Sequence, residues 1–223
     1  MNEIKLDNFF NHISKNGWWF VDVGVNNLDM YLLSIAKYIG NINKSRRTNL
    51  VDILKPTSSE NSRPESLSKI YGLGEFPLHT DTAHWAYPAK YIILGCKTKG
   101  SCDRTTTLLN WFDIKFTTSE KLLLKNAIFL FRNGSNSFYS TIESIFHPFI
   151  RYDRECMYPT SDDSSLLLEI IQEKIATIEK TAFSWENNRI LIIDNWKILH
   201  GRSKTSNTNS NLSSRELHRV LVS

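Results

Sequence analysis

The sequence predicts a mainly β protein in which an antiparallel double sheet of the jelly-roll kind carries helices on its outside. Three observations predict this fold class. From Lys90 onward most segments are short runs of β-branched and aromatic residues, separated by polar or glycine-bearing turns. Helical patterns gather near the N-terminus, and only two interrupt the later strands. No repeat or shift of composition divides the 223 residues, so we expect a single domain over 1–223.

The first third of the chain alternates between helix, strand and loop patterns. The expected segments are a helix over 7–12, a strand over 18–23, a helix over 28–39 and a loop over 56–64. Asp7 can cap the first helix, Gly17 breaks it, and Gly40 ends the second. Serines and two prolines in the fourth segment predict a loop, and we expect residues 56–71 to be mobile.

The remainder of the chain is dominated by predicted strands. They cover 90–96, 105–111, 127–133, 137–142, 148–153, 189–196 and 215–222. Two helices are expected between them, at 119–125 and 164–179, the second capped by Ser164 or Ser165. The run over 189–196 is nearly continuous in apolar character, as a strand buried on both faces should be.

Composition and charge exclude several classes of protein. Hydrophobic residues make up 41% and charged residues 22%, the usual balance of a soluble globular protein. The net charge of +4 is scattered along the chain, so we expect no nucleic-acid partner. Three cysteines without C-x-x-C spacing suit a reducing compartment. Because MNEIKLDNFF lacks a signal-peptide pattern and no apolar run is long enough for a membrane span, we expect a cytoplasmic protein.

One short motif points to chemistry. His79 and Asp81 lie two residues apart at the end of the extended run 76–81, and alternate residues of a strand project from the same face. An imidazole and a carboxylate would then lie side by side. A third ligand from a distant strand, for which His200 is the natural candidate, would complete the two-His-one-carboxylate set of iron(II) oxygenases.

The ordinary interpretation of this motif is that it has no metal, because H-x-D is common and a single histidine beside a strand is most often a core or surface residue. The accompanying residues favour a metal site. Arg215 follows His200 by 15 residues, and Arg219 follows in an R-x-x-x-R register that puts both arginines on one face of a strand. A planar guanidinium can bind a carboxylate with two parallel hydrogen bonds, which suits Arg215 to an anionic ligand.

With these residues in place, the chain resembles the taurine dioxygenase-like (TauD/TfdA) iron(II)/2-oxoglutarate oxygenases. The resemblance extends from about residue 17 to the end. It rests on four segments: YGLGEFPLHTDTAHW (71–85), RTTTLLNW (104–111), LIIDNWKILHGR (191–202) and RELHRVLV (215–222). It implies a double-stranded β-helix, a cupin-like jelly roll, in agreement with the strand pattern.

The resemblance also implies roles for individual residues. His79, Asp81 and His200 match the iron(II) ligands, and Arg215 matches the arginine that pairs with the distal carboxylate of 2-oxoglutarate. A threonine of the next strand usually contacts the same carboxylate. Thr106 fits best, although a one-residue slip would select Thr105 or Thr107 instead.

Further positions and the reaction follow from the same resemblance. Arg219 matches a position that contacts substrate or supports the co-substrate pocket, while the roles of Arg202 and Arg151 stay open. The implied reaction consumes 2-oxoglutarate and O2, releases succinate and CO2, and hydroxylates or desaturates a small molecule. The carboxylate at Asp81 argues against halogenation. A free or carrier-tethered amino acid is the leading candidate substrate; the oligomeric state stays open.

Two alternatives accompany this prediction. The same three ligands could hold zinc or manganese in a cupin-like protein with hydrolase or isomerase chemistry, because ligand identity does not fix the metal. A non-catalytic module that keeps the fold is the other, since the chain is short for the family and the linker 203–214 is unusually polar. Dependence of turnover on O2 and formation of succinate would separate these possibilities.

Overall fold

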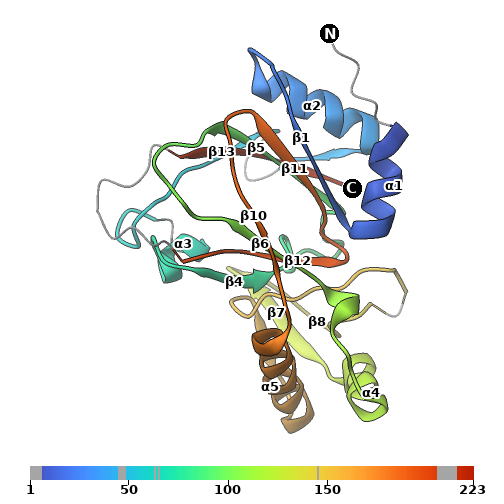
Figure 1. The fold of residues 1–223 in the computed structure, drawn as a ribbon. Helices are drawn as coiled ribbons and strands as arrows, with labels where there is room; N and C mark the ends of the chain where they lie inside the picture. Colours follow the sequence, from blue (N-terminus) through green and yellow to red (C-terminus); the bar gives the residue numbers. More distant parts are fainter. Residues whose placement is uncertain (1–6, 45–48, 63, 65, 145, 205–214) are drawn as a thin grey trace.

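The computed structural model of the chain describes residues 7–44, 49–62, 64, 66–144, 146–204 and 215–223. Within these ranges two antiparallel sheets pack face to face, with helices outside one and a small third sheet beyond the other (Figure 1). The predicted mainly β jelly roll with flanking helices is confirmed.

The larger sheet forms one wall of the double sheet. Its path is β1 (Trp18–Asp22), β11 (Arg189–Asp194), β5 (Tyr91–Thr98), β13 (Glu216–Val222) and β2 (Ile42–Asn43), with β3 (Asp52–Leu54) also pairing with β13. All these pairs are antiparallel. Strands distant in the sequence therefore become neighbours, and the last strand of the chain lies near the centre of the sheet.

Two helices cover the outer face of the larger sheet, α1 (Asp7–Asn16) and α2 (Leu28–Ile39). Helix α2 begins where the side chain of Asn27 accepts a hydrogen bond from the amide of Met30 at 3.1 Å, and its apolar face packs on β5 and β13. Gly95 of β5 makes this approach possible, because a Cβ there would lie 3.0 Å from Leu32. The predicted bounds of α2 are correct, while α1 extends four residues past its expected end.

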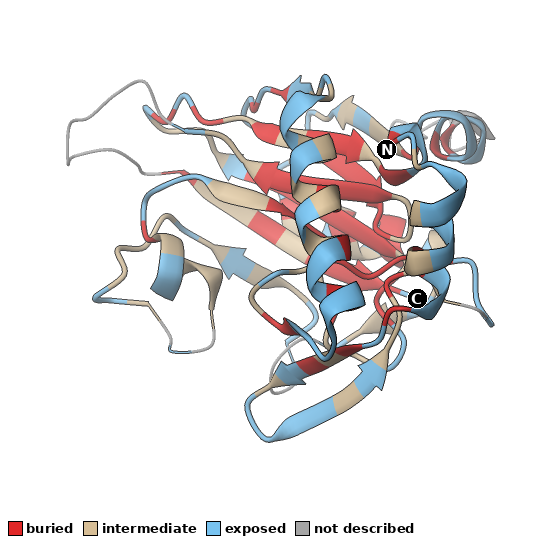
Figure 2. Ribbon diagram, turned by 90° about the horizontal axis from the view of Figure 1, so that it is seen from below, coloured by how far each residue is buried: buried red, intermediate tan, exposed pale blue. Residues whose placement is uncertain are grey.

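The central strands are buried on both faces, which explains their continuous apolar runs. In β5, Tyr91 and Ile93 pack under the helices, whereas Ile92 and Leu94 face the interior between the two sheets. Figure 2 shows the buried strands enclosed by largely exposed helices and loops. The side chains of the predicted metal-binding residues His79 and His200 lie in this interior.

The smaller sheet forms the second wall and carries the predicted site. Its order is β10 (Thr181–Phe183), β6 (Thr106–Asn110), β12 (Ile198–Arg202) and β4 (Phe76–His79). Beyond it lie the third sheet and the remaining helices. These are β8 (Asn136–Ser140), β7 (Phe129–Asn133), β9 (Met157–Pro159), α3 (Leu67–Tyr71), the 3-10 helix η2 (Trp111–Asp113), α4 (Thr118–Asn126) and α5 (Asp162–Thr177).

Several sequence predictions differ from the structure. Residues 148–153 form no strand, and their single ladder contact is an isolated bridge between Glu143 and Ile150. In this segment the Arg151 guanidinium packs among the rings of Phe131, Phe138 and Phe149. The second late helix begins at Asp162, since its N-cap is Ser161, and Ser164 is the N3 partner in the capping box.

Two further predictions concern loops and membranes. The expected loop at 56–71 ends in α3, and its mobility stays a prediction. Most of the polar linker 203–214 lies outside the described residues. None of the helices in the described ranges combines the length and the apolar character that crossing a membrane requires.

Candidate metal centre

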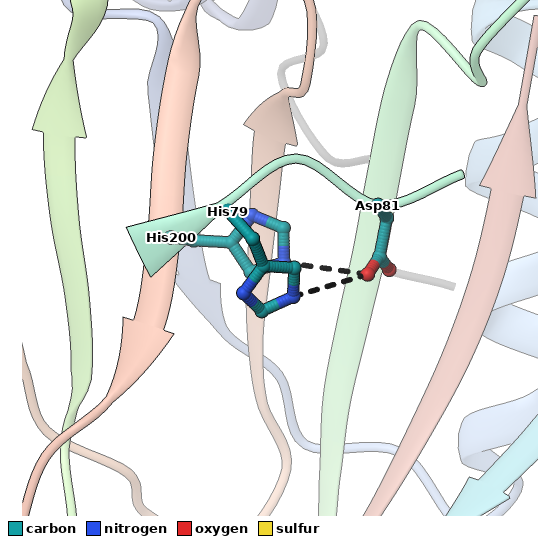
Figure 3. Close-up of side chains that lie close together, drawn as sticks. All are labelled: His79, Asp81 and His200. Atoms are coloured by element: carbon teal, nitrogen blue, oxygen red, sulfur yellow. Dashed lines mark ion pairs between the residues drawn. The ribbon is translucent and has the colours of Figure 1, made fainter. Parts of the chain in front are cut away.

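Three side chains from two neighbouring strands and one turn meet in the interior. His79 ends β4 and lies directly opposite His200 of β12, with 4.6 Å between their ring centroids. The Oδ1 atom of Asp81 lies 3.5 Å from Nε2 of His79 and 3.7 Å from Nε2 of His200 (Figure 3). One ligand atom from each residue falls within 4.8 Å of the others, so the structure brings together the three predicted ligands.

Asp81 reaches this position by a route other than the expected one. The strand β4 stops at His79, so the two residues do not share a face of one strand. Thr82 follows in the left-handed region with φ 58°, and its hydroxyl accepts a hydrogen bond from the amide of Ala89 at 2.9 Å. The orientation of the Asp81 carboxylate is therefore determined by a turn. The backbone of that turn is held by hydrogen bonds from other residues.

Asn195 and Thr80 fix that backbone. The Asn195 side chain is fully buried, accepts from the amide of Asp81 at 2.8 Å and donates to its carbonyl at 2.9 Å. Thr80 donates its amide to the carbonyl of Tyr152 at 2.7 Å and accepts from the amide of Tyr152 at 3.0 Å. The sequence interpretation did not single out Asn195. The feature that could have indicated it is the polar pair Asp194-Asn195 within an otherwise apolar run.

The hydrogen bonds of the imidazoles leave the metal-facing nitrogens available. Nδ1 of His79 lies 2.9 Å from the carbonyl oxygen of Pro77, which can only accept, so Nδ1 carries the proton and Nε2 keeps its lone pair. Nδ1 of His200 is buried, and among the described residues it has no hydrogen-bond partner. Both Nε2 atoms face Asp81 (Figure 3).

The second carboxylate oxygen of Asp81 is held from the opposite wall. Arg219 of β13 donates to Oδ2 of Asp81 at 2.8 Å and to the carboxylate of Asp52 at 2.8 Å. Oδ1 is thereby left to the two imidazoles. This arrangement prepares Asp81 to bind a metal through one oxygen while the guanidinium fixes the rotation of the carboxylate.

The pKa shifts reflect this charge arrangement. Burial raises the pKa of Asp81, yet the positive charge of Arg219 and the two neighbouring imidazoles outweigh burial and hold it well below its usual value. Burial lowers the pKa of His79, but the nearby carboxylates of Asp81 and Asp153 leave it raised. For His200, burial dominates and the pKa falls, even though Asp81 opposes the change.

The donor set fits a divalent transition metal, iron(II) among them. It offers two imidazole nitrogens and one ionised carboxylate oxygen within 4.8 Å, buried at the base of a β-lined interior. Three ligands on one side of an ion leave its other positions open, as a non-haem iron(II) centre requires. His79 and His200 would bind through Nε2 and Asp81 through Oδ1.

Arg215 lies farther from the triad and already has partners. It is buried, and it donates Nε–H to the carbonyl of Lys99 at 3.3 Å and its terminal nitrogens to the carbonyls of Cys102 and Arg104. Three of the five N–H donors of the guanidinium are thus used by the segment that leads into β6. Arg215 precedes β13, and a register shift separates Glu216 from Leu217.

The register of the smaller sheet distinguishes the three threonines. Thr106 pairs with Arg202 and Leu108 pairs with His200, so Thr106 lies on the face that carries His200. Its hydroxyl accepts a hydrogen bond from Trp185 Nε1 at 3.0 Å. Thr107 faces the opposite way, into a cavity of about 290 Å³ beside α5. The amide of Thr105 is bonded to the side chain of Ser203 at 3.0 Å.

The other two arginines left open by the sequence have distinct environments. Arg151 donates to the carbonyls of Ala83, Trp85 and Ala86, so it supports the segment that follows Asp81. Arg202 stacks on the ring of Phe76, 3.6 Å from its centroid, and donates to the carbonyl of Gly72 at 2.8 Å.

Comparison with known proteins adds to this description. No protein-family model matches the sequence, and no curated protein matches it. Among solved structures, an asparagine oxygenase in complex with Fe(II), 3-hydroxyasparagine and succinate superposes with a TM-score of 0.77 at 15% identity. The match covers 97% of this chain and 77% of the asparagine oxygenase.

Two further structures are similar to the same extent. The non-haem iron oxygenase OrfP, in complex with Fe, succinate and (3S)-hydroxy-L-Arg, matches with a TM-score of 0.75 and 15% identity, over 98% of this chain and 80% of OrfP. PvcB from Pseudomonas aeruginosa matches with a TM-score of 0.72 and 16% identity, over 99% and 80%. Another description of PvcB names it an Fe, α-ketoglutarate-dependent oxygenase from an isonitrile synthetic pathway. At such low identity these matches show that the chain has the fold of these oxygenases.

Proposed function

We propose that this chain is an iron(II)- and 2-oxoglutarate-dependent oxygenase that hydroxylates or desaturates a small molecule. The observation that carries the proposal is the meeting of His79, Asp81 and His200, with Arg219 fixing the outer oxygen of the carboxylate. The TauD/TfdA-like resemblance of the sequence and the fold of the matched oxygenases support it in the same direction.

The roles of the residues follow from their positions. When bound at this centre, iron(II) with 2-oxoglutarate and O2 supplies the oxidising chemistry, which converts 2-oxoglutarate to succinate and CO2. His79 and His200 would bind the metal through their Nε2 atoms, and Asp81 would provide the anionic ligand. Arg215 and Thr106 belong to the subsite for the distal carboxylate. The apolar walls around Leu94, Leu108 and Trp185 exclude water from the reacting atoms.

An amino acid or a derivative of one is the substrate class that we propose. The asparagine oxygenase and OrfP were both crystallised with hydroxylated amino acids, which supports this class for a chain of the same fold. Within this proposal, Arg219 supports the pocket beside the metal through its ion pairs with Asp81 and Asp52.

The test is a succinate-release screen in air and under anaerobic conditions. Purified protein with iron(II) and 2-oxoglutarate is offered free amino acids, and products are examined by mass spectrometry for a gain of one oxygen or a loss of two hydrogens. We expect succinate formation that requires O2 and disappears in D81A and H200A. The exposed Asp113, changed to Asn, is the matched control and should keep wild-type turnover.

The alternative metal chemistries predict a different result. Turnover of a substrate without O2 and without succinate would contradict the oxygenase proposal and favour a hydrolase or isomerase at the same three ligands. Absence of binding of iron(II), zinc and manganese alike in the wild type would contradict any metal-dependent function at this site.

A further inference from the structure

Segment 81–89, which begins with the candidate ligand Asp81, contains no helix or strand, yet its backbone is held at both ends. The Asn195 side chain donates to the carbonyl of Asp81 at 2.9 Å and to that of Ala89 at 2.8 Å. Turns and bends have no hydrogen-bonded ladder, so the conformation of this segment depends on bonds from side chains. The groups that hold its middle therefore decide whether it is fixed as a whole.

Arg151 holds the middle of segment 81–89. Its guanidinium donates to the carbonyls of Ala83 at 3.1 Å, Trp85 at 2.8 Å and Ala86 at 2.9 Å. One rigid group thus binds three carbonyls, and the planar fork of an arginine fixes their relative directions. A lysine, whose donors share a single nitrogen, does not offer this geometry.

The surroundings of Arg151 are apolar. Its side chain is 3% exposed, and the guanidinium carbon lies 5.3, 4.9 and 5.0 Å from the ring centroids of Phe131, Phe138 and Phe149. Within the described ranges no carboxylate forms an ion pair with Arg151, and its Nε atom has no hydrogen-bond partner. Burial accordingly lowers the pKa of Arg151 to about 10.

Packing alone does not account for a guanidinium at this position. A buried charge without a carboxylate partner is costly, whereas an unbranched apolar side chain such as methionine would fill the space among the three rings without that cost. The contribution that requires an arginine is the set of three bonds to the carbonyls of residues 83–86. The contacts therefore favour a role in holding that stretch of backbone.

Thr82 shows why the stretch has to be held. Its φ of 58° lies in the left-handed region, which a β-branched residue rarely adopts and which persists only where the neighbouring residues are fixed. Asn195 fixes Asp81 on one side of Thr82, and Arg151 fixes Ala83 on the other. If Thr82 relaxed, the peptide that joins it to Asp81 would rotate, and the carboxylate would turn away from the two imidazoles.

We propose that Arg151 is a positioning residue of the candidate metal centre: by fixing residues 83–86 it holds Thr82 in the left-handed conformation and keeps the Asp81 carboxylate directed at the imidazoles. This inference rests on the metal centre of the proposed function. Phe131 and Phe138 belong to β7 and β8, so the third sheet is connected to the metal centre through Arg151.

Three variants separate positioning from general destabilisation. R151M keeps the apolar packing but loses all three bonds to carbonyls, and R151K keeps the charge but loses the planar fork. L124A is the control. Leu124 of α4 is 1% exposed and belongs to the same apolar cluster as Phe131, so L124A leaves a cavity and lowers the melting temperature without removing a bond to segment 81–89.

Hydrogen exchange of the metal-free variants, followed by mass spectrometry, measures how firmly the segment is held. The amide of Trp85 donates to the carbonyl of Thr82, and the amide of Ala89 donates to its hydroxyl, so both are protected while Thr82 keeps its conformation. Loss of charge-assisted hydrogen bonds should speed exchange of residues 82–89 in R151M by about tenfold or more. We expect L124A to exchange this segment as the wild type does.

Titration with cobalt(II), whose visible ligand-field bands report the geometry of its ligands, measures the effect on the metal centre. Groups that orient a metal ligand change affinity by about 10–100-fold, and we expect R151M to lose about tenfold, because Arg151 acts through the backbone. The bands of R151M should differ from those of the wild type. L124A should keep both affinity and bands, and R151K should fall between R151M and the wild type.

Wild-type exchange of residues 82–89 or wild-type cobalt(II) affinity and bands in R151M would overturn the role of Arg151 while leaving the proposed function intact. Should R151M fail to fold, the same results in R151K would overturn it. Equal changes in L124A and R151M would show that general destabilisation is the cause, and would also overturn the role. A wild type that binds neither cobalt(II) nor iron(II) would contradict the metal centre of the proposed function, and the positioning role would fail with it.

Discussion

The two oxygens of Asp81, the proposed anionic ligand, have different partners, and Arg219 keeps them separate. The guanidinium holds Oδ2 at 2.8 Å, while Oδ1 faces both imidazoles. Arg219 comes from the larger sheet, whereas the histidines come from the smaller one. A metal bound at the triad would therefore be connected to both walls through this single ion pair. Groups that orient a metal ligand typically change metal affinity by about 10–100-fold when removed.

We therefore predict that R219Q weakens iron(II) binding by about 10–100-fold, because the carboxylate of Asp81 loses the group that fixes its rotation. The measurement is a competition titration of iron(II) against a chelating dye under anaerobic conditions. R189Q is the matched control, since Arg189 makes a similar two-pronged ion pair with Asp22, which contacts none of the three triad residues. Equal iron(II) affinities in R219Q and R189Q would show that Arg219 has no part in orienting Asp81.

For individual residues, the sequence predicts which three side chains form the candidate metal centre. It does not predict the interactions that bring them together. The spacing of His79 and Asp81 suggested two side chains on one strand face, whereas a turn with a left-handed Thr82 aims the carboxylate. Asn195 holds that turn from 114 residues away in the chain. Long-range hydrogen bonds of this kind have no periodicity in the sequence, so a pattern of residue types does not indicate them.

At the scale of elements, the close packing of β12 against β4 determines where the two histidines lie. Gly201 follows His200, and a Cβ at this position would meet the carbonyl oxygen of Phe76 at 2.6 Å and that of Pro77 at 3.2 Å. Both atoms belong to the backbone of β4, which has no flexible side-chain end to move away. The absence of a side chain at Gly201 thus lets β4 approach closely enough for His79 and His200 to pair.

The prediction for this element is that G201A separates β4 from β12, lowers the melting temperature by several degrees and weakens iron(II) binding. Overpacking of a rigid site typically costs about 1–3 kcal/mol. Thermal unfolding followed by circular dichroism and the same dye titration measure the two effects. Gly24 offers the control, because a Cβ there would meet nothing within 4 Å, so G24A should melt close to wild type. A wild-type melting point and affinity in G201A would contradict this account of the strand pair.

Elements with strong local signals were the predictable ones. The helix over 28–39 has an apolar face with a 3.6-residue period and a stop at Gly40, and the structure has those bounds. The strand β12 was missed because it follows β11 within one apolar run. The turn between them depends on Asp194, whose side chain accepts from the amide of Trp196 at 3.1 Å. An Asp-Asn pair within such a run is the signal that could have indicated the turn.

At the scale of the whole molecule, three apolar layers alternate with the sheets, and the polar site lies where the inner layer meets the smaller sheet. One apolar cluster lies beneath α1 and α2, one lies between the two sheets, and one lies beneath α4 and α5. The series of short predicted strands after the early helices predicted the double sheet. The strand order β1-β11-β5-β13-β2 was not predictable from local pattern, because each pairing joins segments distant in the chain.

Metal binding should stabilise this whole arrangement, because the triad is assembled only in the folded chain. A ligand that binds only the folded state stabilises it by RT ln(1 + [L]/Kd), about 2.7 kcal/mol at 100 times Kd. For a chain of this size that free energy corresponds to a rise in melting temperature of roughly 5–10 °C. Anaerobic differential scanning fluorimetry with iron(II) measures the rise.

The rise in melting temperature should vanish in the double variant H79A/H200A, which lacks both imidazoles. It should be smaller in R219Q at the same iron concentration, because R219Q is predicted to bind the metal more weakly. A rise in melting temperature in the double variant equal to that of the wild type would mean that the metal binds at another site. It would contradict the assignment of the triad as the metal centre.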